Sequence, residues 1–285
     1  MSPRGLQVGA SVLLLHRASC GKCHFCRDSG GVNSARCMEL PFYVYGISHD
    51  GGYQEYLLAH RNSLMAIPGD IPHSSACFLY CTAAVAMRAL SLHGRALPSM
   101  AVLITGASGG VGVHAIQVAK ALRCTVVATT SAAQKKQALL DLGADHVLLT
   151  ERGKPFQQAV LSLVPGGVDI VLELVGEPTF NSSLRCLKPT GRMVVVGNVS
   201  TTSVRLNLGL IILNELHVSG SSSASRHDMA EVFELVLRGD LTPVISMTLP
   251  LSKESVLQAH RLLSSSAAPL GRIVLLPWQA GRAAL

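Results

Sequence analysis

The sequence predicts an α/β protein, because from residue 100 onward short apolar runs alternate with amphipathic stretches. Strand-like runs that are separated by helical patterns and short turns imply parallel strands joined by right-handed crossovers. The composition agrees: 48% of the 285 residues are hydrophobic and only 4% are aromatic, a balance suited to strands buried on both faces. A glycine-rich turn separates the first strand-like run from the first helical one. Together these features favour a doubly wound parallel sheet.

The expected elements follow one another closely along the chain. Strands are expected at 101–104, 125–129, 147–149, 170–174 and 193–196, and helices at 111–122, 133–142, 156–163 and 181–187. Two further helices at 228–238 and 252–264 and a last strand at 273–276 complete the chain. Residues 1–72 are rich in Gly, Cys and His, and their strand-like runs at 11–15 and 53–58 predict an irregular all-β region.

The charge pattern argues against a polyanionic partner. The formal net charge is +7, but Lys and Arg are scattered and form no basic run beside an aromatic platform, so we expect no nucleic-acid binding. No apolar run approaches the roughly 18 residues of a membrane span, and the N-terminal residues do not have the pattern of a secretory signal. We therefore expect a soluble cytoplasmic protein without a membrane partner.

The turn at residues 105–112 reads TGASGGVG, directly follows a predicted strand and opens a predicted helix, which is the context typical of a dinucleotide site. Gly109 would let the backbone approach a pyrophosphate, and Gly112 would let the helix pack tightly on the sheet. The helix N-terminus would supply free amide donors. The predicted cofactor-binding residues of this turn are Ala107, Gly109, Gly110, Val111 and Gly112. The alternative is a turn whose glycines serve only the backbone.

The end of the second strand favours NADP(H) over NAD(H). NAD enzymes hold the ribose hydroxyls with an Asp or Glu about 20 residues after the glycines, but residues 113–140 contain no acid. The strand instead leads to Ser131, and Lys135 follows in the next helix. A hydroxyl and an ammonium group suit a 2′-phosphate, so Ser131 and Lys135 are its predicted contacts. The alternative for Lys135 is a solvated helix face.

Four of the eight cysteines, Cys20, Cys23, Cys26 and Cys37, lie in one short segment. Four thiolates in a compact loop can form the closed tetrahedral shell of a structural zinc ion. The alternative is an iron–sulfur cluster, but the ferredoxin spacing places the fourth cysteine three residues on and before a proline. Here ten residues intervene and Met38 follows. We therefore predict structural zinc, a site with no open position for chemistry.

The sequence resembles the zinc-containing alcohol dehydrogenase and quinone reductase branches of the medium-chain dehydrogenase/reductase superfamily. The motifs that carry the resemblance are the strand 9–15, the four-cysteine segment, 51–56, 76–90, the glycine turn, 143–145, 169–176, 191–197 and 271–275. The resemblance implies a Rossmann domain inserted into a GroES-like catalytic domain. The implied boundaries are 1–83 for a partial GroES-like domain with the zinc lobe, 84–222 for the NADP-binding Rossmann domain, and 223–285 for the return to the catalytic domain.

The resemblance also implies roles for single residues. Arg272 would contact the cofactor pyrophosphate, and Gly197 and Asn198 would lie beside the nicotinamide. Cys81 falls where zinc-dependent members carry their third catalytic-zinc ligand. The family's other ligands come from a cysteine and a Gly-His-Glu motif that precede the zinc lobe, and this sequence contains neither. We therefore expect an N-terminally truncated catalytic domain. Without these ligands we expect no catalytic zinc, because one thiolate alone cannot hold it.

The implied function is an NADP(H)-dependent oxidoreductase acting on small alcohols, carbonyls or enones. The alternative is a non-catalytic NADP(H)-binding truncated isoform or fragment, and the missing ligands lead us to expect slow turnover or none. By the same resemblance, the apolar stretch 208–213 and a strand at 215–220 would pair two Rossmann sheets in a homodimer.

Overall fold

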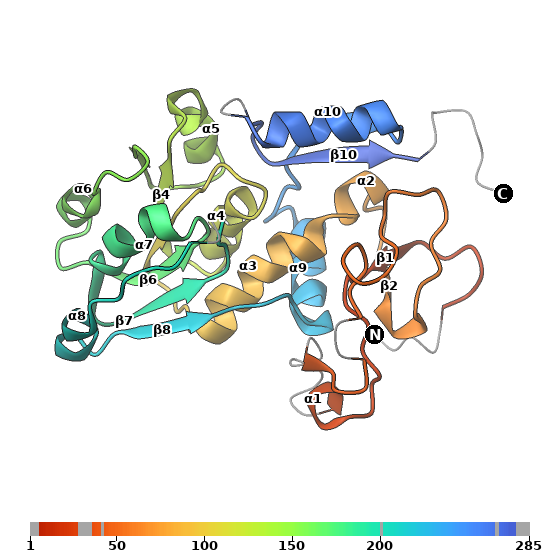
Figure 1. Cartoon of the computed structure of the whole chain (residues 1–285), viewed down its shortest axis with the longest axis horizontal. Helices are drawn as coiled ribbons and strands as arrows, with labels where there is room; N and C mark the ends of the chain where they lie inside the picture. The colour runs from red at the N-terminus through yellow and green to blue at the C-terminus, as the bar shows by residue number, and fades with distance from the viewer. Residues whose placement is uncertain (1–5, 28–35, 41–42, 200–201, 266–267, 278–285) are drawn as a thin grey trace.

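The computed structural model describes residues 6–27, 36–40, 43–199, 202–265 and 268–277. A six-stranded parallel sheet occupies one half of the molecule (Figure 1), with the strand order β5-β4-β3-β6-β7-β8. Counted within the sheet this order is 3-2-1-4-5-6, which places the topological switch point between β3 and β6. The predicted α/β fold with a doubly wound parallel sheet is confirmed.

The sheet and its helices follow the alternation of the sequence. The strands are β3 (Ala101–Ile104), β4 (Thr125–Thr130), β5 (His146–Leu149), β6 (Val168–Glu173), β7 (Leu187–Val195) and β8 (His217–Gly220). The connecting helices are α4 (Gly112–Ala121), η7 (Ala133–Lys135), α5 (Lys136–Asp141), α6 (Gln157–Leu163), α7 (Glu177–Leu184) and α8 (Leu208–Leu213). The helix expected at 181–187 begins and ends earlier, because Pro178 occupies its first turn and Leu187 already starts β7.

Helices cover both faces of the sheet, so its central strands are buried on both sides. All four residues of β3 are buried. Val102 and Ile104 belong to a core shared with α4, whereas Ala101 and Leu103 belong to a second core shared with α6 and α7. The alternating side chains of one strand therefore contribute to two separate cores.

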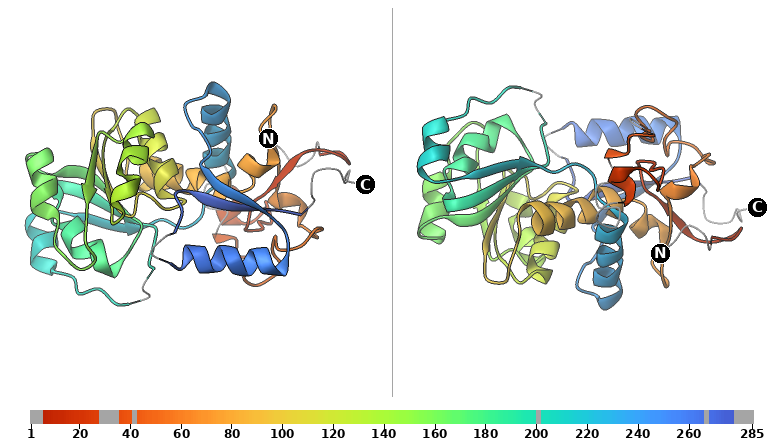
Figure 2. Two further views of the ribbon diagram at one scale, coloured as in Figure 1. Left: turned by 90° about the horizontal axis from the view of Figure 1, so that it is seen from above. Right: turned by 90° about the horizontal axis from the view of Figure 1, so that it is seen from below.

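The other half of the molecule is built from both ends of the described chain (Figure 2). Its N-terminal part contains β1 (Val12–Leu14), which pairs antiparallel with β2 (Leu64–Ala66), the short helix α1 (His24–Arg27) and the turn η4 (Arg61–Ser63). Its C-terminal part contains α9 (Arg226–Arg238), β9 (Ile245–Pro250), α10 (Lys253–Leu263) and β10 (Arg272–Leu276). β9 and β10 pair in parallel, and α10 lies along them (Figure 1).

Two details of this half differ from the sequence-based expectation. The expected strand at 53–58 is wrong: these residues form bends and irregular backbone, and no described strand pairs with them. Conversely, β9 was not expected. Its side chains are mostly half-buried and do not alternate cleanly, so only its pairing with β10 makes it a strand.

A long helical segment joins the two halves. It runs through α2 (His73–Ala76), η5 (Leu79–Cys81), α3 (Ala83–Arg88) and η6 (Ala89–His93). Contrary to expectation, the segment His73–His93 is long and apolar enough to cross a membrane, but 72% of its most apolar window is buried inside the protein. Every residue of α3 is buried, which is the behaviour of a core helix.

Hydrogen bonds fix α9 to the N-terminal part. The Arg226 guanidinium donates to the carbonyl oxygens of Asn62 at 2.5 Å and Leu64 at 2.6 Å. Nearby, the Tyr80 hydroxyl donates to the Ala224 carbonyl oxygen at 2.5 Å. These contacts join residues more than 140 positions apart in sequence.

Hydrogen bonds of the His114 side chain link α4 to the segment that precedes β9. Its Nε2 accepts a hydrogen bond from the Val244 backbone N–H at 3.1 Å, so the ring proton lies on Nδ1 and donates to the Gly110 carbonyl at 2.7 Å. Burial lowers the pKa of His114 to about 4. The folded protein therefore holds a neutral imidazole where the unfolded chain would hold a protonated one in mild acid.

This shift predicts an acid-sensitive fold. The pKa of His114 falls from 6.5 unfolded to about 4 folded, so its stabilising contribution is complete above pH 6.5 and is lost as the pH falls toward 4. The loss in unfolding free energy is on the order of 3 kcal/mol. We expect urea unfolding of His114→Gln to depend less on pH across this range than unfolding of the unchanged protein. His217→Gln, which alters an exposed histidine, is the matched control. Equal pH dependence in all three proteins would contradict this role for His114.

Candidate functional site

The glycine turn lies at the carboxyl end of β3, where it leads into α4. A Cβ atom added at Gly112 would lie 2.5 Å from the Ala107 Cα and 2.6 Å from its carbonyl oxygen. Only glycine therefore permits this approach of the helix to the turn. Gly106 has a φ of +57°, in the left-handed region. The turn thus presents the N-terminus of α4 at the edge of the sheet where ligands bind in this topology.

Arg272, the first residue of β10, reaches this turn from the other end of the chain. A Cβ atom at Gly110 would lie 2.6 Å from the Arg272 Cδ and 2.9 Å from its Nε. That Nε is buried and has no hydrogen-bond partner among the described residues. A buried guanidinium N–H normally has an acceptor, and a pyrophosphate oxygen at the turn would provide one. The turn and Arg272 therefore fit a phosphorylated ligand.

A cavity of about 270 Å³ continues from the turn along the same edge of the sheet. Its lining comes from the residues that follow successive strands: Gly106, Thr129, Thr130, Ser131, Thr150, Glu151, Arg152, Val175, Pro178, Thr179 and Val199. The lining mixes apolar groups with hydroxyls, as expected of a site for the adenosine part of a nucleotide. The predicted contact Ser131 lies here.

Sequence reasoning missed two charged residues of this cavity, Glu151 and Arg152. They follow β5, and the parallel order of the strands is the signal that could have found them. The Glu151 carboxylate forms an exposed ion pair with Lys154 at 2.5 Å. The other predicted contact, Lys135, is half-buried, and its ammonium group donates to the Ala268 carbonyl oxygen. This bond uses one of its three donors.

Gly197 and Asn198 follow β7, next to the loop that follows β6. A Cβ atom at Gly197 would lie 2.0 Å from the Leu174 carbonyl oxygen. A Cβ atom at Gly176 would lie 2.8 Å from the Asn198 Oδ1. The two loops therefore run in close contact, and the two glycines make that contact possible.

The buried carboxylate of Glu173 fixes the start of the loop after β6. One of its oxygens accepts hydrogen bonds from Thr105 Oγ1 at 2.8 Å, from Thr179 Oγ1 at 2.7 Å, and from the backbone N–H groups of Val175 and Gly176 at 2.9 and 3.0 Å. The other accepts from Ser183 Oγ at 2.7 Å. Glu173 is 0% exposed, and five donors compensate for the cost of burying it.

Cys81, at the end of η5, lies beside a histidine that sequence reasoning did not assign to the site. Its Sγ is 3.3 Å from the His16 Nδ1, and the His16 ring lies edge-on to Tyr80 with centroids 5.2 Å apart. Burial raises the pKa of the Cys81 thiol and lowers the pKa of His16. Both groups therefore favour their neutral forms. The pair offers two donor atoms, whereas catalytic zinc sites use three protein ligands.

The sulfur atoms of Cys20, Cys23, Cys26 and Cys37 all lie within 4.8 Å of one another. Cys20 and Cys26 are 3.8 Å apart and Cys23 and Cys37 are 4.0 Å apart. A regular tetrahedron with Zn–S bonds of about 2.3 Å has S···S edges of about 3.8 Å. The four sulfurs therefore fit one zinc ion. Among the described residues, these four cysteines are the group of at least three potential ligands whose donor atoms lie close enough together to hold one metal ion.

Backbone amides already point at these sulfurs. The N–H groups of Lys22 and Cys23 donate to the Cys20 Sγ at 3.4 and 3.2 Å, and the Cys20 N–H donates to the Cys37 Sγ at 3.3 Å. The Met38 N–H is the main group that lowers the pKa of Cys23, to about 6. Amide donors of this kind stabilise thiolate, the form that binds metal.

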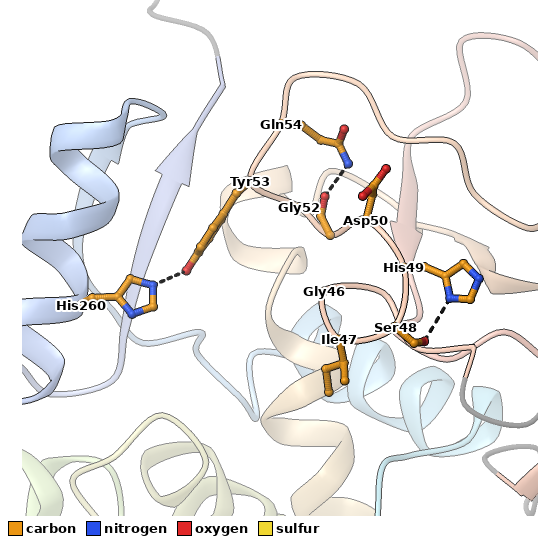
Figure 3. Close-up of a pocket in the computed structure, with 10 residues that line it drawn as sticks. Gly46, Ile47, Ser48, His49, Asp50, Gly52, Tyr53, Gln54 and His260 are labelled. Carbon is orange, nitrogen blue, oxygen red and sulfur yellow. Dashed lines mark hydrogen bonds between the residues drawn. The ribbon is translucent and has the colours of Figure 1, made fainter.

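A further hollow lies elsewhere on the described surface. About 930 Å³ in volume, it is formed by the loop 46–54 and His260 of α10 (Figure 3). The Tyr53 hydroxyl lies 3.0 Å from the His260 Nε2 across it. Its walls are open to solvent, with Ile47 85% and Tyr53 63% exposed. It lies apart from the glycine turn and the cysteine cluster, so we assign the site to the edge of the sheet.

A doubly wound α/β sheet with a glycine turn and a four-cysteine lobe defines the class of protein, and comparison with known proteins defines the family. Residues 110–238 match the zinc-binding dehydrogenase family. The chain is 32% identical over 275 residues to the acryloyl-coenzyme A reductase of Sulfurisphaera tokodaii, covering 96% of this chain and 78% of the relative. It is 30% identical over 232 residues to the quinone oxidoreductase of Lama guanicoe, covering 79% and 69%.

Solved structures agree. The crystal structure of an NAD-dependent alcohol dehydrogenase superposes with a TM-score of 0.86 at 26% identity, covering 95% of this chain and 77% of that one. The chain belongs to the zinc-type medium-chain dehydrogenase/reductase superfamily, a family of oxidoreductases.

The cysteine geometry predicts one tightly held zinc ion per chain. We expect Cys37→Ser to lose most of the zinc and to loosen the lobe, because three ligands no longer close the shell. Elemental analysis of protein purified in reducing buffer measures the metal, and limited proteolysis measures the lobe. Cys77→Ser, which alters an exposed cysteine outside the cluster, should keep the full zinc content. Iron with sulfide in the unchanged protein would contradict the assignment.

Proposed function

We propose that this protein is an NADP(H)-dependent oxidoreductase that transfers hydride between the nicotinamide and a small alcohol, carbonyl or enone. The main observation behind the proposal is the position of Arg272. This residue lies against Gly110, and its buried Nε has no hydrogen-bond partner among the described residues. A guanidinium and a helix N-terminus that converge on one turn are suited to a pyrophosphate. The bound cofactor would supply the hydride chemistry.

The chain's own residues would bind and orient that cofactor. We assign the pyrophosphate to Gly109, Gly110, Val111 and Arg272, with Ala107 and Gly112 setting the approach of α4. We assign the nicotinamide end to Gly197 and Asn198, whose loop is held in place by the contacts at Leu174 and Gly176. Fixed positions of this kind lower the entropic cost of bringing the reacting atoms together.

We place the substrate beside Cys81, at the position where zinc-dependent relatives carry a catalytic ligand. The names of two relatives narrow its class: acryloyl thioesters and quinones both contain a carbon–carbon double bond conjugated to a carbonyl. We therefore favour an enone-type substrate over a simple alcohol. In this proposal Cys81 and His16 border the substrate as neutral groups, and neither acts as a metal ligand.

A panel of enones, quinones and aldehydes tests this function. Because the catalytic-zinc ligands are missing, we expect turnover to be slow, but in long incubations NADPH deuterated at C4 should transfer deuterium to the reduced product of at least one conjugated carbonyl compound. Arg272→Gln should lower kcat/KM by roughly ten- to a hundredfold, because it removes a charge-assisted contact worth about 1.5–3 kcal/mol. Arg185→Gln, at an exposed site on the far end of α7, is the matched control. NADPH binding with no turnover of any compound would instead support a non-catalytic NADP(H)-binding protein.

The preference for NADP(H) rests on Ser131 and Lys135. Ser131 lines the cavity beyond the glycine turn, and the acid in that lining, Glu151, is paired with Lys154. Lys135 retains two N–H donors beyond its bond to Ala268. A hydroxyl and an ammonium group at the end of β4 favour a 2′-phosphate over a free ribose hydroxyl.

Cofactor titration by fluorescence tests this preference. Lys135→Ala should weaken NADPH binding by about 1–2 kcal/mol and leave NADH binding nearly unchanged, because only NADPH carries the 2′-phosphate. Lys136→Ala removes a neighbouring exposed lysine and should leave both affinities unchanged. Tighter binding of NADH than of NADPH by the unchanged protein would refute the assignment.

We further propose a cytoplasmic homodimer that pairs through α8 and β8. β8 is an edge strand of the sheet, and beside it Ile212 and Leu213 are 71% and 85% exposed. An exposed apolar helix next to an unpaired strand edge favours association with a second copy. Sedimentation velocity should show a dimer that Leu213→Asp dissociates, whereas Leu263→Asp, an exposed leucine on α10, should not. A monomer at all concentrations would exclude this arrangement.

A further inference from the structure

Another cavity, about 390 Å³ in volume and partly open to solvent, lies between the four-cysteine lobe and the sheet. The residues that decide its chemistry are Arg17, Arg36, Arg88, His93 and Ser221. They come from three separate parts of the chain. Arg36 precedes the proposed zinc ligand Cys37. Arg88 is the last residue of α3 and His93 is the last residue of η6, and Ser221 follows β8.

The lining is strongly cationic. Three guanidinium groups border the cavity, and none of the described residues that line it is an acid. Arg88 is 5% exposed and forms an ion pair with Asp228, whose Oδ2 lies 3.6 Å from the Arg88 Nη1. Asp228 is already engaged at the cap of α9, where it accepts from the Ser225 N–H and Oγ, both at 2.6 Å. The described lining therefore presents several positive groups to one space.

The charges are close enough to affect one another. Burial lowers the pKa of His93, and the charges of Arg88 and Arg36 lower it further, while Asp228 acts in the opposite sense. The imidazole therefore favours its neutral form in a positive field. Like charges gathered around one space repel each other, and a bound anion would relieve that repulsion.

A second, independent observation points into the same cavity. Ser221 is 7% exposed, and its Oγ is buried without a hydrogen-bond partner among the described residues. Its position is fixed, because its backbone N–H donates to the Val195 carbonyl oxygen at 2.9 Å. Buried hydroxyls normally have a partner, so the structure offers a donor with no acceptor beside a group of cations.

We propose that this cavity binds an oxyanion, the phosphate or carboxylate group of a small molecule. Arg17, Arg36 and Arg88 supply the charge, and Ser221 supplies a hydrogen bond. Guanidinium groups suit such ligands, because their paired N–H donors match two oxygens of a phosphate or carboxylate. The cavity contains none of the residues assigned to the cofactor. Anion binding there requires no turnover and does not depend on the proposed hydride transfer.

Calorimetry on the zinc-loaded full chain, without cofactor and at low ionic strength, tests the proposal. Pyrophosphate and citrate are the two probes, and the tighter of them identifies phosphate or carboxylate as the ligand chemistry. Because pyrophosphate could also enter the glycine turn, variants distinguish the two sites. Arg36→Gln and Ser221→Ala should each weaken the probe by about tenfold or more and leave NADPH affinity unchanged. Arg272→Gln should instead weaken NADPH binding and leave binding of the probe to this cavity unchanged.

Arg36 is exposed, so its substitution should leave the fold intact, and the melting temperature of each variant checks this. Arg185→Gln makes the same change of charge on the surface and should leave probe binding unaltered. Saturable binding that Arg36→Gln and Ser221→Ala weaken supports the cavity. The proposal is overturned if neither probe binds saturably, if Arg185→Gln weakens binding as much as Arg36→Gln, or if only Arg272→Gln abolishes it.

Discussion

The approach of α4 to the turn after β3 is the contact on which the proposed nucleotide site depends. Because residue 112 is glycine, the helix begins within van der Waals distance of Ala107, and its first amides face the carboxyl edge of the sheet. Gly110 then leaves room for Arg272, a residue from the last strand of the described chain. His114, in the first turn of the same helix, forms hydrogen bonds with Gly110 and Val244. The site thus links both halves of the molecule.

Buried polar groups hold the loops of this edge. Glu173 gathers donors from the ends of β3 and β6 and from α7. A buried carboxylate needs nearly all of its donors, because each unmade hydrogen bond in a nonpolar interior is costly. The loop after β6 is therefore confined to one conformation. It contacts the loop of Gly197 and Asn198 through Leu174 and Gly176, so this network also positions the proposed nicotinamide end.

Folding brings together positive side chains that are scattered along the sequence. Along the sequence, Lys and Arg are scattered and form no basic run. In the structure, Arg17, Arg36 and Arg88 border one cavity. The joining helix and the four-cysteine lobe bring them together. Positive side chains that lie far apart in the sequence thus meet around one space.

The sequence alone determined the alternating strands and helices, the glycine turn, the cysteine cluster and the family, because each depends on residues that are neighbours or regularly spaced along the chain. Tertiary structure decided the rest. β9 is a strand only because β10 pairs with it, whereas the run at 53–58 has no described partner strand. His16 joins Cys81, and Ser221 joins the arginines, across more than 60 residues. Contacts of this kind depend on how whole elements pack, and no local pattern encodes them.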